Sequence, residues 1–288
     1  VPKKDPMGMD YIPVYDDAAR RITGGAVPYR DFAFEYPPLA AVLITTARLL
    51  PLPFTTGFSL MMLIALVVTA LGVMAIARTL GMSRARQLGA GGVIAALPVL
   101  LGDFVATRFD LALAALLAWM VWAAVSLRWR TAWALLAAAV ALKLAPVILV
   151  PLLVVWHRRH RGGRAATAGA GMAATAVLGT FLPFLVLSPS GVWRMFAYHL
   201  DRPLQIESLG SAYLLGLHAL ADIPLRVVTT FGSQNLVGDG PSVIAALSTA
   251  IALVGIGGRL ALAGAVATAS DDVAHLLAAP RRHAARVL

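Results

Sequence analysis

Long apolar runs separated by short polar gaps make up most of the chain. The runs cover residues 37–50, 54–77, 88–101, 109–127, 131–156, 165–187 and 241–268, and a weaker run over 209–231 is interrupted by polar residues. A helix needs about 20 mainly apolar residues to cross a membrane. Because several runs reach that length, the pattern predicts an all-α, polytopic bundle of transmembrane helices with short broken helices and outer loops between them.

The composition agrees with this pattern. Of the 288 residues, 59% are hydrophobic and 13% are charged, and the mean hydropathy is +0.80. Soluble domains have roughly 45–50% apolar and about 25% charged residues, so an ordinary soluble domain and a disordered chain are both excluded. The chain has no cysteine, which excludes disulfides, thiolate metal sites and cysteine nucleophiles. No P-loop, GxGxxG, HExxH or GxSxG motif occurs.

The arginines predict the orientation of the bundle. Three gaps, 78–87, 128–131 and 157–164, contain arginine and no acidic residue. Positively charged loops stay on the cytoplasmic side of a membrane. This rule places 102–108, 188–209 and 1–36 on the outer side, so the net charge of +10 is a topology signal and no nucleic-acid partner is expected. Both glutamates, Glu35 and Glu207, then lie outside, and a site built from acids should open there.

The run 131–156 is too short for two crossings. Both of its flanks are predicted to be inside, yet it holds only 26 residues, whereas two full spans need about 40. We therefore expect a helical hairpin that enters from the cytoplasm and turns at 143–146. Lys143 would lie at this turn, where a cation suits a phosphate head group. A lysine that extends its ammonium group to the membrane surface is the alternative.

Three polar strings could form a site with Lys143. "YRDFAFEYPPLA" (29–40) is either an aromatic belt at the membrane interface or a pocket for sugar rings and hydroxyls. "YHLDRPLQIES" (198–208) is either a solvated loop or a site in which Arg202 holds a phosphate and His199 donates a proton. In "GDFVATRFD" (102–110), Arg108 is a candidate anion ligand and Asp110 is expected to begin a helix, although Asp103, Arg108 and Asp110 could instead pair with one another.

The first residues contain weak candidates for a metal site. Met7 and Met9 lie close to Asp10 in "VPKKDPMGMDYIPVY", and thioether ligands select Cu(I). Two methionines without cysteine or nearby histidine make a sparse ligand set, so a polar loop is the simpler interpretation.

Five strings together resemble glycosyltransferase family 87. They are "PVYDDAARRITGGAVPYRDFAFEYPPLA", "RFDLALAALLAW", "ALKLAPVILVPLLV", "YHLDRPLQIES" and "FGSQNLVGDGPS", in this order. The resemblance spans roughly Asp10 to Thr268. It implies an integral membrane enzyme of GT-C fold in the bacterial cytoplasmic (inner) membrane, with its site facing outward. Such an enzyme transfers a hexose, typically mannose, from a polyprenyl-phosphate donor to a hydroxyl of a glycolipid or glycan with inversion.

The resemblance also implies roles for individual residues. Asp10 matches the family's acceptor base, and Glu35 is the fallback for that role. Residues of the matching motifs are implied to bind substrate, and with Arg108 they are Tyr29, Asp31, Tyr36, Lys143, His199, Arg202, Gln205 and Glu207. Because side-chain cations could replace a divalent ion beside a monophosphate, we expect that no metal or other cofactor is required.

The chain departs from the family at both ends. Relative to the family, we expect a helix ahead of Asp10 and further helices at the end that this sequence does not display. Residues 1–15 resemble the metal-binding segment of periplasmic adaptors of copper/silver efflux pumps. The expected organisation is an outer loop with a short amphipathic helix over 1–36, a transmembrane domain over 37–268 and a polar tail over 269–288. A transporter or copper-handling protein and an inactive truncated fragment are the alternative interpretations.

Overall fold

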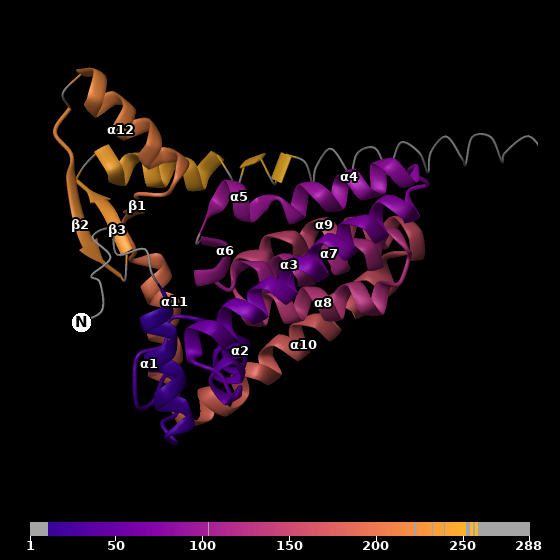
Figure 1. The fold of residues 1–288 in the computed structure, drawn as a ribbon, viewed down its shortest axis with the longest axis horizontal. Coiled ribbons are helices and arrows are strands. Elements are labelled where there is room, and N and C mark those ends of the chain that lie inside the picture. Colours follow the sequence, from indigo (N-terminus) through magenta and orange to yellow (C-terminus); the bar gives the residue numbers. More distant parts are fainter. Residues whose placement is uncertain are drawn as a thin grey trace, which may run out of the picture.

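The structure is a computed structural model that describes residues 11–102, 104–221, 223–231, 233–238, 240–251, 254–255 and 257–258. Four helices, α3 (Phe54–Thr79), α7 (Asp110–Val125), α8 (Trp129–Leu142) and α10 (Gly163–Leu187), form a bundle (Figure 1). The all-α expectation is therefore confirmed. Candidate residues Met7, Met9, Asp10 and Asp103 and the tail 269–288 lie outside the described residues.

Two helices in the described residues are long and apolar enough to cross a membrane, α3 and α10. Side chains on α3 such as Leu63, Ile64 and Val67 are more than half exposed. A row of exposed large apolar side chains is unfavourable in water and is expected where a helix faces lipid. Gly72 on α3 allows close packing against α7, because a Cβ there would lie 3.0 Å from the Cβ of Ala118.

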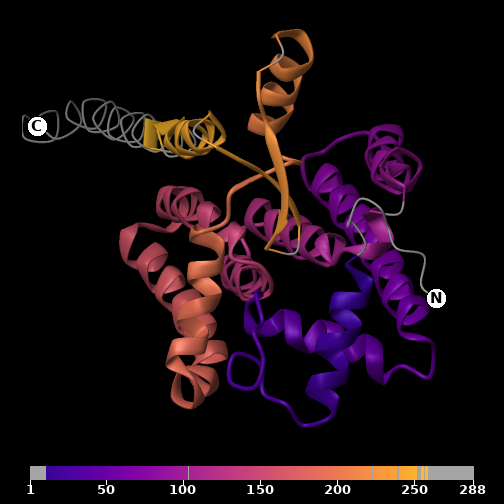
Figure 2. The same cartoon turned by 90° about the vertical axis from the view of Figure 1, so that its left-hand side faces the viewer.

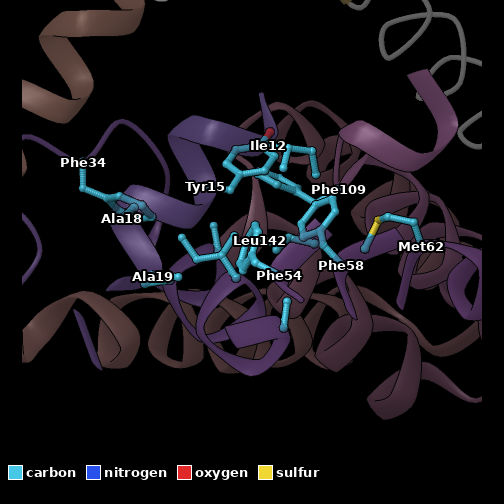
Figure 3. Packing of buried hydrophobic residues seen from close by; sticks show 14 of the residues in the cluster. Ile12, Tyr15, Ala18, Ala19, Phe34, Phe54, Phe58, Met62, Phe109 and Leu142 are labelled. Carbon is cyan, nitrogen blue, oxygen red and sulfur yellow. The ribbon is translucent and has the colours of Figure 1, made fainter. Parts of the chain in front are cut away.

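The N-terminal helix α1 (Ile12–Thr23) is the predicted amphipathic helix. It ends at Gly24 and Gly25, where Gly25 has a φ of 94° that favours glycine. Its buried face carries Tyr15 and Ala19, and the Tyr15 ring lies 5.3 Å from that of Phe58 on α3. Figure 3 shows this packing, in which α1 shares a core with the bundle. A short helix, α2 (Pro38–Leu49), follows and begins with proline at its first position.

The sequence predicts one continuous helix over residues 88–101, and this prediction is wrong, because the structure has two helices there. The structure has α4 (Arg84–Ala95) and α5 (Leu97–Leu101), followed by the single turn α6 (Phe104–Thr107). Pro98 lies in the first turn of α5, where proline is tolerated, whereas inside a continuous helix it would remove a backbone hydrogen bond.

The hairpin with its turn at residues 143–146 is confirmed. α8 ends at Leu142, Lys143 has an extended backbone, and a 3-10 helix η1 (Ala145–Leu149) leads into α9 (Val150–Arg161). The two arms return to the same end, because the Trp129 ring stacks on that of His157 at 4.3 Å and 13°. The arginine-containing gaps lie at this end of the bundle, on the right in Figure 1, and the tip of the hairpin points to the opposite end.

The segment after α10 contains strands that the sequence reading missed. Helix α11 (Pro189–Leu200) leads to β1 (Leu204–Gln205), then to α12 (Leu209–Ala221), β2 (Arg226–Thr230) and β3 (Ser233–Val237). The strands form an antiparallel sheet of order β1-β3-β2, with Leu204 opposite Leu236 and Val228 opposite Asn235. The weak apolar run 209–231 is thus a helix and a strand rather than one span. Figure 2 shows this unit projecting from the bundle.

Candidate active site

A cavity of about 520 Å³ lies at the end of the bundle opposite the arginine-rich gaps. Residues from α1, the loop before α2, the start of α7, the hairpin tip, α11 and β1 line it. We call it the cationic cavity, because Arg108, Lys143 and Arg202 line it, and His199 lines it with them. Its acids in the described residues are Glu35, Asp110 and Glu207, and Tyr36 and Gln205 also line it. The fold therefore brings together eight of the candidates named from the sequence: Glu35, Tyr36, Arg108, Lys143, His199, Arg202, Gln205 and Glu207.

A second cavity of about 350 Å³ shares one wall with the first. We call it the aromatic cavity, and it lies between α1, the loop 29–36 and α11. Four residues border both cavities: Tyr15, Glu35, Tyr36 and Tyr198. Asp17, Arg21 and Arg194 add polar groups to the aromatic cavity alone. Glu35 is thus the acid that the two cavities have in common.

The loop before α2 places Glu35 within a row of aromatic side chains. Phe32, Phe34 and Tyr36 occupy every second position of this loop, and Glu35 lies between the last two. The three rings pack edge to face at 6.1 and 5.9 Å, and Tyr36 continues the row to Phe109 at 5.0 Å. The aromatic row anchors the loop, and Glu35, which lies between Phe34 and Tyr36, is thereby held where it lines both cavities.

Phenols surround the Glu35 carboxylate. Burial first, and hydrogen bonding with Glu35 second, raise the pKa of Tyr198 above its usual range. Burial and the charges of Tyr15 and Glu35 raise the pKa of Tyr36 in the same direction. Both phenols therefore stay protonated at neutral pH and can donate. Among the described residues, Glu35 is the cavity acid that forms no salt bridge.

The other two cavity acids are paired with cations. Arg108 donates two hydrogen bonds to Glu207, at 2.8 and 3.1 Å, and lies over the Tyr11 ring. Burial acts against the charge of Arg108, but hydrogen bonding and the charge of Glu207 outweigh it and raise the pKa of Arg108. Lys143 Nζ lies 2.5 Å from Asp110 Oδ1. Arg108 thus pairs with an acid 99 positions away in the chain, and the suggested pairing with Asp103 lies outside the described residues.

Arg202 differs from Arg108 and Lys143, since no acid among the described residues neutralises it. Its guanidinium donates to Ser233 Oγ at 2.6 Å, and its Nε is buried without a hydrogen-bond partner there. His199 Nε2 lies 2.9 Å from the Glu35 backbone oxygen, so Nε2 must carry the hydrogen, because a carbonyl oxygen only accepts. Arg202 is therefore the cavity cation best placed to meet an anion, with the His199 ring beside it in the same cavity.

Two candidates lie apart from the cationic cavity. Tyr29 is 2% exposed, borders the aromatic cavity and donates its hydroxyl to the Tyr36 carbonyl at 2.5 Å. Asp31 accepts from the Val27 N–H and from Arg30 and borders neither cavity. The hydrogen bond from Arg30, then that from Val27, lowers the pKa of Asp31 to about 2. This geometry suits a turn-forming role for Asp31, and its predicted role in substrate binding is not tested.

The structure adds residues that the sequence reading did not single out. Tyr11, Tyr15, Phe109 and Tyr198 form aromatic walls, and Ser233 positions Arg202. Ser233 lies in the string "FGSQNLVGDGPS", which had been noted without a role. For a metal ion, the described residues contain no group of three or more histidine, aspartate or glutamate side chains that could hold one.

Comparison with known proteins supports an assignment to a family. The chain is 31% identical over 170 residues to GPI mannosyltransferase 1 of Aspergillus fumigatus (strain ATCC MYA-4609 / CBS 101355 / FGSC A1100 / Af293). That match covers 58% of this chain and 40% of the fungal protein, so the chain spans well under half of that relative. No solved structure matches.

The profile of glycosyltransferase family 87 matches residues 34–280. That range contains most of the chain, including Glu35, Lys143, His199 and Arg202 of the cationic cavity. The chain belongs to glycosyltransferase family 87.

Proposed function

We propose that this protein transfers a hexose, with mannose as the first candidate, from a polyprenyl-phosphate donor to a hydroxyl of a glycolipid or glycan. The observation that supports this most is one cavity that combines an unneutralised arginine, Arg202, with an acid free of salt bridges among the described residues, Glu35. A sugar phosphate needs both groups, a cation for the departing phosphate and a carboxylate for the acceptor proton. The name of the fungal relative supports mannose.

The phosphate of the donor would lie between Arg202 and His199. The Arg202 guanidinium group contacts Ser233 and the Tyr198 ring, so it is oriented before a ligand binds. A protonated His199, whose Nε2 faces the Glu35 carbonyl, has Nδ1–H left to donate. Lys143 can join by leaving Asp110, since both side chains of that pair are over a third exposed. Arg108 stays on Glu207 and shapes the wall.

The sugar would be transferred in one displacement. The acceptor oxygen bonds to the anomeric carbon, a carboxylate takes the hydroxyl proton, and the bond from that carbon to the phosphate oxygen breaks with its electron pair on the phosphate. Attack from the face opposite the phosphate inverts the anomeric centre. Asp10 remains the base implied by family resemblance, and it directly precedes Tyr11, which lines the cationic cavity.

Glu35 is the base that the described geometry supports. Tyr198 has one hydroxyl hydrogen and two acceptors, the Glu35 carboxylate and the Phe231 carbonyl. When Glu35 takes a proton, it can donate to Tyr198 while Tyr198 donates to Phe231, so the protonated form is well accommodated. Because Glu35 borders both cavities, the donor phosphate can occupy the cationic cavity while an acceptor sugar enters from the aromatic one.

The arrangement of charge supports an outward-facing site in a bacterial cytoplasmic membrane. The gaps with Arg78, Arg84, Arg128 and Arg158 lie at the end of the bundle away from the two cavities. If this end is cytoplasmic, the cavities open to the outer side. We also propose that no metal is required, because the cavity itself supplies cations.

The decisive experiment is a transfer assay with polyprenyl-phosphate mannose and the full chain in membrane vesicles. Glu35→Gln and Asp10→Asn are compared with the wild type at saturating donor. A fall of about 100-fold or more in kcat for at least one variant is expected for loss of a general base. Unchanged kcat in both variants would remove the carboxylate mechanism. NMR of the product linkage tests inversion, and an excess of chelator tests the metal.

A further inference from the structure

A third cavity, of about 590 Å³, lies at the arginine-rich end of the molecule. We call it the basal cavity. It is bounded by α8, α9 and α10 and is lined by Trp129, Trp133 and His157 and by the arginines Arg130 and Arg161. It lies at the opposite end of the hairpin from Lys143, so it is separate from the cavities assigned to sugar transfer.

The wall of the basal cavity is fixed by specific contacts. The Trp133 Nε1–H donates to His157 Nδ1 at 3.1 Å, and both side chains are buried. The Trp129 ring stacks on the His157 ring at 4.3 Å. Gly169 on α10 makes room for this wall, because a Cβ there would lie 2.3 Å from Trp133 Nε1. The cavity is therefore a built feature and not a gap between mobile side chains.

The charge around the basal cavity has one sign. The sequence contains no acidic residue between Asp110 and Asp201, the stretch that supplies α8, α9 and α10. In the described part of the chain neither Arg130 nor Arg161 forms a salt bridge. Two guanidinium groups that line one cavity beside an aromatic wall suit a phosphate group, and no acid of these three helices competes for them.

The surroundings of the cavity are apolar. Met172 and Leu127 line it and are over 40% exposed, and further along α10 Leu178 and Leu182 are about 60% exposed. If the anion bound here is the phosphate of a lipid, the acyl chains of that lipid could lie along the exposed apolar side chains of α10. Basic pockets between helices on the positively charged side of membrane proteins bind anionic lipid head groups.

We propose that the basal cavity binds the phosphate of one anionic phospholipid between Arg130 and Arg161, with its acyl chains along α10. This site is independent of sugar transfer and of the donor lipid. Phosphatidylglycerol is the probe, since its phosphodiester has one negative charge. Phosphatidylcholine has the same phosphate with a compensating cation, and inorganic phosphate has no acyl chain.

The test is a titration of the full chain in neutral detergent micelles, read by native mass spectrometry for lipid retained per chain and by the shift in Tm. We expect one phosphatidylglycerol to bind saturably, with phosphatidylcholine and inorganic phosphate much weaker. The Arg130→Gln/Arg161→Gln variant should lose roughly 30-fold in affinity, because each basic residue near an anionic surface contributes about a factor of five. The matched control is Arg84→Gln/Arg86→Gln, which removes the same charge from a gap outside the cavity.

The outcomes separate a built site from surface charge. Equal losses in the two double variants, or equal binding of phosphatidylcholine, would overturn the proposal. Inorganic phosphate that binds as tightly as phosphatidylglycerol would overturn the lipid assignment. An Arg130→Lys/Arg161→Lys variant preserves charge without the guanidinium fork, so full retention of affinity by this variant contradicts a bidentate site. The Arg130→Gln/Arg161→Gln variant should retain sugar transfer, because the basal cavity shares no lining residue with the cationic cavity, and loss of transfer in this variant would overturn the independence of the two sites.

Discussion

Lys143 and Asp110 are 33 positions apart in the chain, yet the ammonium group of one lies 2.5 Å from the carboxylate of the other. The contact joins the tip of the α8–α9 hairpin to the first turn of α7. Both side chains are partly exposed, so the contact adds little to stability, at most about 1 kcal/mol. The contact instead holds Lys143 at the cationic cavity, from where its ammonium group can leave Asp110 and bind a ligand.

Removal of Asp110 should therefore strengthen donor binding. Asp110→Asn leaves Lys143 without its acid, so we expect a severalfold lower Kd for polyprenyl-phosphate mannose, whereas Lys143→Met should raise it. Equilibrium binding of radiolabelled donor measures both changes. If Asp110→Asn weakens binding as much as Lys143→Met does, the pair acts as a structural unit and Lys143 does not contact the phosphate.

Arg202→Gln should raise the KM for the donor. A hydrogen bond to a charged group contributes roughly 1.5–3 kcal/mol, which corresponds to about 10- to 150-fold in KM. Arg202→Lys should recover part of this loss. The matched control is Arg226→Gln, at an exposed position on β2 of the same sheet, and its KM should stay within twofold of the wild type. If Arg202→Gln and Arg226→Gln raise the KM to a similar extent, the effect comes from disturbance of the sheet and not from loss of a phosphate contact.

Tyr198→Phe tests the surroundings of Glu35. The variant keeps the ring contacts but loses the hydroxyl that interacts with Glu35 and Phe231. We expect kcat to fall while donor KM stays close to the wild-type value, because the hydroxyl stabilises the base and not the phosphate. Steady-state kinetics separates the two parameters. A change in KM alone would assign Tyr198 to substrate binding.

The Asp31 carboxylate predicts a pH dependence of stability. Its pKa is lowered to about 2 in the folded chain, against about 3.9 when unfolded. A lowered pKa stabilises the fold above the unfolded value, and this contribution disappears as the pH falls through about 2. The difference in Tm between wild type and Asp31→Asn should therefore be largest at pH 6 and shrink towards pH 2.5. A difference in Tm that stays constant across this pH range would mean that the charge of Asp31 does not contribute to stability.

Two glycine positions provide a matched packing test. A Cβ at Gly191 on α11 would lie 2.0 Å from the Tyr29 carbonyl oxygen, whereas at Gly179 on α10 nothing lies within 4 Å. Gly191→Ala should displace α11 from the loop 29–36 and lower the free energy of unfolding by about 1–3 kcal/mol. We expect a lower Tm and lower transfer activity. Gly179→Ala should leave both nearly unchanged. Equal Tm values for the two variants would contradict the tight approach of α11 to the loop.

The helices could be predicted because apolar runs determine where they lie. The hairpin turn at Lys143 followed from length and charge together, since the arginines place both flanks of residues 131–156 on one side and the run is too short for two spans. The strand Arg226–Thr230 was missed because its "RVVTT" string was included in the weak apolar run 209–231. Its β-branched residues were the available signal. Within the site, the residue types were visible, but the pairing of Arg108 with Glu207 depends on how distant segments fold together.

The α8–α9 hairpin has a mechanical consequence. Its arms are joined where Trp129 and Trp133 contact His157, and at the far end Leu142 is buried in the core that α1, α2 and α3 share. The hairpin is therefore fixed at both ends and acts as a strut. With 14 residues in α8 and a rise of 1.5 Å per residue, the strut is about 20 Å long. A change in the packing of Trp129 against His157 is therefore expected to be transmitted along α8 to Lys143 at the cationic cavity.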